Sequence, residues 1–169
     1  MMNRIFENKL FPEIEEFFAS KGFTVLYEDI EGKNVLIMEP DSDVLFEDCN
    51  ITVDSFDEES TAVNILFTLE SKLPDEFSDN VDDLLLYLNK YLTIGCFELI
   101  KENGFFFFRC SYLADTQAPI VQVMKVFLMT WQIASDTAVQ GSQIVRSLIQ
   151  GEAEIGELLS DDSSIIQFD

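Results

Sequence analysis

The chain has 169 residues, which suits one domain, and its 47% hydrophobic content is more than a disordered chain carries. A net charge of −22 repels nucleic-acid phosphates and anionic lipids, so we expect neither as a partner. The absence of histidine excludes Ser-His-Asp and Cys-His catalysis and the common histidine metal sites. The acidic charge either favours basic partners or only keeps an apolar protein soluble.

The N-terminal part predicts one helix and then four strands. The helix is expected from Phe11, with Pro12 in its first turn and Gly22 at its end, and residues 3–10 form a preceding turn or a kinked extension. Short turns, including Glu31-Gly32, separate the strands and favour an antiparallel meander. The four strands are predicted over residues 24–28, 34–38, 50–56 and 62–69.

A β-hairpin is predicted around Asn103-Gly104, because a type I′ turn needs positive φ at both central residues. With these two residues as the turn, Glu98 faces Arg109 across the strands. The opposite side of the hairpin then forms an apolar core face. This face consists of Phe97, Leu99, Phe106, Phe108, Cys110 and Tyr112.

Two further helices are predicted on either side of this hairpin. The first begins at Ser78 or Asp79 and gives way to the hairpin at Gly95, and the second runs from Pro119 to about Gln150. The order of elements is therefore α-ββββ-α-ββ-α, an α+β fold in which an antiparallel sheet packs against helices.

The long helix has a wider apolar arc than a surface helix normally carries. Either the helix is buried between the sheet and other elements of the chain, or part of the arc packs against a second copy or a partner. The candidate residues for such an interface are Val126, Leu128, Met129, Ile133 and Ile144.

The last residues differ in character from the rest of the chain. Residues 152–169 carry six acidic and no basic side chains, so we separate them as an acidic C-terminal tail from a domain spanning residues 1–151. The tail is either loosely docked or a short segment that binds a partner.

The motifs of common enzyme and metal sites are missing. There is no glycine-rich phosphate loop, and Cys49, Cys96 and Cys110 lack metal-site or redox spacing. Asp41-Ser42-Asp43 resembles the start of a calcium loop but lacks its glycine and closing glutamate. We therefore predict no catalytic residue, metal or cofactor. Because the N-terminus lacks the apolar core of a secretory signal, a cytoplasmic location is expected.

Residues 84–92, 95–99, 103–113 and 148–151 carry a pattern that resembles the type III secretion chaperone-like fold, in particular the YbjN-like group of small acidic bacterial proteins. The resemblance covers about residues 11–151 and leaves out the tail. It implies a cytosolic, homodimeric protein that holds a segment of a client on apolar patches without catalysis, with the dimer face on the helices. The YbjN-like group is associated with a regulatory role.

Three functions remain open at this point. The first is a non-catalytic, chaperone-like module that binds a partner protein or peptide. The second is an acidic regulator that competes for a basic surface of another protein, for example one that binds nucleic acid. The third is an enzyme of unrecognised type, which would need convergent polar groups in a cleft.

Overall fold

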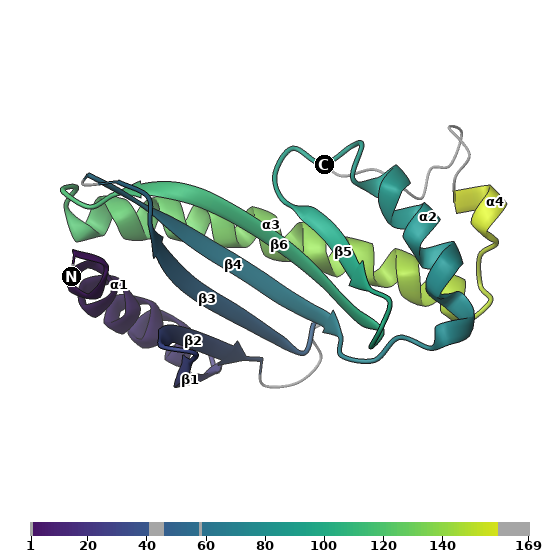
Figure 1. The fold of residues 1–169 in the computed structure, drawn as a ribbon, viewed down its shortest axis with the longest axis horizontal. Coiled ribbons are helices and arrows are strands. Elements are labelled where there is room, and N and C mark those ends of the chain that lie inside the picture. The colour runs from purple at the N-terminus through teal and green to yellow at the C-terminus, as the bar shows by residue number, and fades with distance from the viewer. Residues whose placement is uncertain (1, 41–45, 58, 159–169) are drawn as a thin grey trace.

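The computed structural model describes residues 2–40, 46–57 and 59–158, and it confirms the α+β class. Six antiparallel strands form one sheet in the order β1-β2-β3-β4-β6-β5. Helices α1 and α3 pack side by side on one face of this sheet, and α2 lies beyond β5 (Figure 1). The strands are β1 Thr24–Ile30, β2 Lys33–Glu39, β3 Asp48–Ser55, β4 Ser60–Glu70, β5 Cys96–Ile100 and β6 Phe105–Asp115. The helices are α1 Met2–Ala19, η1 Asp75–Phe77, α2 Ser78–Leu88, α3 Ile120–Ile149 and α4 Ile155–Leu158.

Helix α1 includes residues 3–10, for which the sequence leaves open a preceding turn or a kinked extension of the helix. It begins at Met2, so Pro12 lies inside the helix and not in its first turn. The helix continues through the proline because residues before it, including Phe6 and Leu10, are buried in the core. At its end, the Phe23 N–H donates to the Phe18 carbonyl and Gly22 adopts a φ of 91°, as in a Schellman motif.

The β5–β6 hairpin has the predicted core face but a different register. Glu98 lies opposite Phe107, two residues from the predicted Arg109, and the connecting loop spans residues 101–104. Of the two central residues predicted for the turn, only Gly104 has positive φ. The Asn103 side chain instead accepts a hydrogen bond from the Phe105 N–H. This bond stabilises an Asx turn and a longer loop in place of the type I′ turn.

The shift by two residues leaves every side chain on its predicted face, because side chains alternate with a period of two. Arg109 therefore still forms an ion pair with Glu98, now as a diagonal neighbour. The β1–β2 hairpin has the two-residue turn with positive φ at both positions, 54° at Glu31 and 83° at Gly32. A type I′ turn thus occurs at a less typical sequence than Asn-Gly.

The core lies between the sheet and helices α1 and α3. Phe18 of α1 contacts Phe127 and Trp131 of α3, and Trp131 also contacts Phe67 of β4. The end of α3 reaches β5, where Gly141 leaves room for the Phe97 ring; a Cβ atom on Gly141 would lie 2.1 Å from that ring. The helix ranges predicted for α3 agree with the structure, whereas α2 ends at Leu88, before Gly95.

The predicted tail begins with an ordered segment. Residues 155–158 form α4, and the Leu158 side chain is buried beside α2. The rest of the tail and Asp41-Ser42-Asp43 lie outside the described residues.

Candidate functional site

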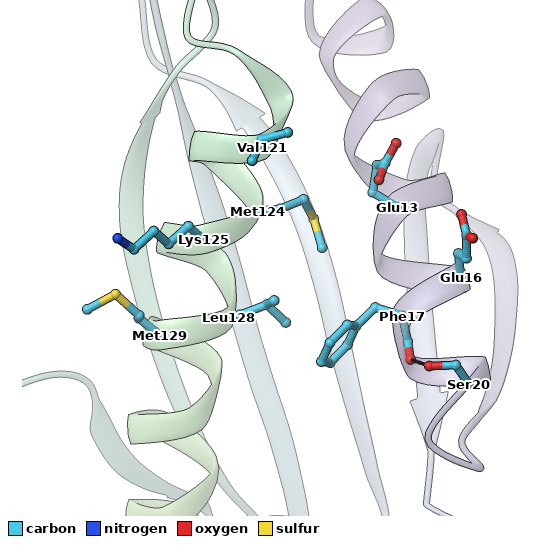
Figure 2. A pocket seen from close by; sticks show the side chains of 9 residues that line it. All are labelled: Glu13, Glu16, Phe17, Ser20, Val121, Met124, Lys125, Leu128 and Met129. Atoms are coloured by element: carbon cyan, nitrogen blue, oxygen red, sulfur yellow. Dashed lines mark hydrogen bonds between the residues drawn. The ribbon is translucent and has the colours of Figure 1, made fainter.

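An apolar groove with a volume of about 710 Å³ lies between α1 and α3. Figure 2 shows Met124 and Leu128 of α3 pointing toward α1, and Phe17 of α1 pointing toward α3. We call this hollow the α1–α3 groove. It is lined by Glu13, Glu16, Phe17, Ser20, Val121, Met124, Lys125, Leu128 and Met129.

The groove is acidic along α1. Glu13 and Glu16 line this side, and neither forms an ion pair with another described residue. Lys125 belongs to the lining of the other side, but Figure 2 shows its side chain pointing away from α1. An apolar floor beside unopposed carboxylates suits a ligand that is both apolar and positively charged.

The predicted interface residues of α3 separate into three environments. Val126, Met129 and Ile133 are 48%, 58% and 52% exposed and form a continuous strip, which we call the α3 strip. Leu128 is part of the groove, and Met129 lines the edge of the groove as well as the strip. Ile144 is only 7% exposed and belongs to the core, so it is not available to a partner in this fold.

The contribution of α1 to the groove could not be predicted from the sequence. The Phe17-Phe18 pair carries the only local signal, because adjacent helical residues point in different directions. Phe18 is buried, and this leaves Phe17 at the margin of the core, in the groove. Which of the two rings faces outward depends on how α1 packs on α3, and that packing is a tertiary property.

The three cysteine thiols are poorly suited to nucleophilic catalysis. All three cysteines are free, and burial raises the pKa of the Cys110 thiol to about 11 and that of Cys49 well above its ordinary value. Burial and the neighbouring Glu98 also raise the pKa of Cys96. These thiols therefore stay protonated at neutral pH, whereas nucleophilic cysteines need a lowered pKa. No group of three or more potential metal-ligating side chains occurs among the described residues.

The open face of the sheet carries a polar row. Asn64 donates to Asp54 and to Thr52, and Ser111 donates to Asn64. These side chains bond to one another across β3, β4 and β6. Their hydrogen-bonding capacity is largely used within the sheet, so this row explains the solubility of the face better than it explains a ligand site.

Comparison with known proteins gives no assignment: no protein-family model matches the sequence, and no curated protein matches it. Within the described part of the chain, none of the helices combines the length and the apolar character needed to cross a bilayer.

Proposed function

We propose that this chain is a non-catalytic, chaperone-like module that holds a segment of a partner protein on an apolar surface. The α1–α3 groove carries the proposal, because Phe17, Met124 and Leu128 line a hollow that the described chain leaves open. Grooves of this kind between helices accept the apolar face of an amphipathic segment.

The acidic side of the groove narrows the class of partner. Glu13 and Glu16 favour a segment with lysine or arginine beside its apolar residues, and the net charge of −22 attracts such a segment at long range. An acidic segment would be repelled by the same charges.

We also propose the family to which the chain belongs. The helix, sheet and long-helix arrangement agrees with the YbjN-like, type III secretion chaperone-like resemblance at the level of an α+β fold. Under this proposal the protein acts in the cytoplasm as a homodimer, with the α3 strip as the surface between the two copies. Three adjacent apolar side chains that are about half exposed support the choice of this surface.

The alternative function is an acidic regulator that competes for a basic surface of another protein. The composition favours it, because 32 acidic side chains against 10 basic ones give the chain a net charge of −22. Such a regulator would be retained by a DNA-binding protein at low salt and released at moderate salt, and a client-holding module would keep its ligand through apolar contacts.

The test is peptide binding by two matched variants. A panel of basic amphipathic peptides is titrated into the wild-type chain, into Leu128→Asp and into Ile133→Asp, and anisotropy gives the affinity. We expect Leu128→Asp to weaken binding about tenfold or more, because it places a charge in the groove, and Ile133→Asp to leave it unchanged. Absence of binding by the whole panel, or equal losses in both variants, would contradict the groove.

The dimer is tested separately by light scattering at two protein concentrations. We expect a dimer in the wild type that a Val126→Asp, Ile133→Asp double variant dissociates while it stays folded. A wild-type monomer at both concentrations would exclude the α3 strip as a self-association surface and leave the groove proposal intact.

A further inference from the structure

The two edges of the sheet are treated differently by the fold. At β5, Asn89 follows α2 and bonds to the outward backbone of the strand. Its Oδ1 accepts from the Phe97 N–H at 2.8 Å, and its Nδ2 donates to the Phe97 carbonyl at 3.0 Å. The asparagine side chain therefore takes the place that another strand would occupy, and β5 cannot pair further at this residue.

At the other edge, β1 keeps its outward backbone free. The residues next to the two-residue turn, Ile30 and Lys33, form a hydrogen-bonded pair, and the pattern alternates along the hairpin. The backbone groups of Val25, Tyr27 and Asp29 therefore point away from β2. Within the described part of the chain, none of these groups makes a backbone hydrogen bond.

The sequence of β1 lacks several of the features that prevent edge pairing, and its only charged residues are the acidic Glu28 and Asp29. The strand is 7 residues long, contains neither lysine nor proline, and pairs with β2 without a bulge. Soluble proteins usually protect such an edge with one of these devices. The strand also holds a fixed position, because the Tyr27 hydroxyl donates to the Glu15 carboxylate of α1 at 2.8 Å.

We propose that β1 is an acceptor for an extended segment of a partner protein, which adds a seventh strand to the sheet. Leu26, Glu28 and Ile30 project from the open face in the order apolar, acidic, apolar. The matching segment has apolar, basic and apolar residues at alternate positions. Backbone hydrogen bonds supply affinity in this mode of binding, and the alternating side chains supply specificity.

The charges around β1 favour a basic partner over a second copy of this chain. Glu28, Asp29 and Glu31 lie on the strand and its turn, and Glu15 lies beside Tyr27. A second copy would bring the same carboxylates to the interface and a further net charge of −22. A segment with lysines or arginines would find a carboxylate on each side of the new strand.

The probe for this inference is a peptide of about eight residues, the length of a typical strand, with valine, lysine and valine at alternate positions and threonine between them. The protein variants are Tyr27→Pro, which removes the outward N–H, and Tyr27→Ala, which keeps it. A proline is tolerated at an edge position whose N–H faces solvent, and thermal unfolding of the two variants checks that both remain folded. N-methylation of the peptide at alternate residues removes the N–H donors that the peptide would offer to β1. This control uses the wild-type protein, so it does not depend on whether a variant folds.

We expect the peptide to slow amide exchange at Val25, Tyr27 and Asp29 by about tenfold or more, and Tyr27→Pro to bind roughly tenfold more weakly than Tyr27→Ala. The Leu128→Asp groove variant should bind as the wild type does, which separates this site from the α1–α3 groove. Three results would overturn the proposal. They are equal binding of a peptide with glutamate in place of lysine, protection confined to α1 and α3, or concentration-dependent protection of β1 without peptide, which would assign the edge to a second copy.

Discussion

The two edge strands of the sheet, β5 and β1, differ in whether their outward backbone groups are free to pair with another strand. Both strands expose one row of N–H and C=O groups on the side away from their neighbour. In β5, Asn89 bonds to the outward groups of Phe97, whose ring is 1% exposed in the core. In β1, every residue except Val25 is exposed. The fold is therefore closed and heavily packed at one edge and open at the other.

The largest contrast should appear when one aromatic residue is removed from each edge. Phe97→Ala deletes a ring that contacts Phe106 and Phe108, and we expect it to lower the free energy of unfolding by about 3–5 kcal/mol. Tyr27→Ala removes a ring that is 49% exposed and should cost about 1 kcal/mol. Urea unfolding of both variants measures the difference, and similar losses would contradict the description of the two edges.

The Asn89 bridge provides the next test. Asn89→Ala leaves the Phe97 N–H and carbonyl without their partners, and we expect a loss of about 1–3 kcal/mol together with faster exchange of the Phe97 amide. Asn89→Asp keeps the acceptor for the N–H but turns a carboxylate oxygen toward the Phe97 carbonyl, so it should not restore the stability of the wild type. An Asn89→Ala chain with unchanged Phe97 exchange would show that the bridge does not protect this edge.

A substitution in the β1–β2 turn, at the open edge of the sheet, should raise the stability of the fold. Glu31 adopts a φ of 54°, which glutamate disfavours and asparagine tolerates. We therefore expect Glu31→Asn to raise the free energy of unfolding by about 0.5–1 kcal/mol. Gly32→Ala serves as the opposite control and should lower stability by about 1 kcal/mol, because Gly32 has a φ of 83°. Thermal melts that reverse this order would contradict the type I′ turn.

The smallest effect concerns Asp48 on the open face of the sheet. Burial raises the pKa of its carboxyl above the ordinary value of 3.8, although Thr68 and Asn50 donate hydrogen bonds to it. The folded state therefore holds a proton that the unfolded chain releases, and the contribution of Asp48 to stability falls as pH rises above 3.8.

Asparagine at position 48 keeps the Oδ1 atom that accepts both hydrogen bonds and has no charge. At neutral pH we expect Asp48→Asn to match or exceed the wild type by less than about 1 kcal/mol. As the pH falls toward 4, the free energy of unfolding of the wild type should rise relative to that of the variant. Chemical unfolding of both chains across this pH range measures the difference. If the variant became more stable relative to the wild type on acidification, the pKa of Asp48 would be lowered in the folded state and not raised.

The sequence predicted which side of a strand faces the core better than it predicted the strand register and the loop length. The alternation of Phe97, Phe106 and Phe108 identified the core side of the β5–β6 hairpin, and an error of two residues in register does not change that side. The length of the loop depended on the Asn103 side chain and on Leu73, whose N–H donates to the Gly104 carbonyl. The hydrogen bond between Leu73 and Gly104 joins distant parts of the chain, so the local sequence pattern cannot predict it.

The candidate surfaces were predictable to a similar degree. The width of the apolar arc on α3 predicted Val126, Met129 and Ile133 as interface residues; the structure exposes all three, and their role in an interface stays a prediction. Ile144 shares the same side of the helix, yet it is buried toward the other end of α3. The α1–α3 groove and the free edge of β1 depend on how helices and strands associate, so periodicity within one element cannot reveal them.

Amide hydrogen exchange of the free chain at low concentration, read residue by residue, tests the open edge of β1 most directly. We predict fast exchange at Val25, Tyr27 and Asp29 and slow exchange at Phe97, with Leu26 and Glu28 protected by β2 as an internal reference. If the outward amides of β1 exchanged as slowly as Phe97, the edge would already be covered in the free chain and could not receive a partner.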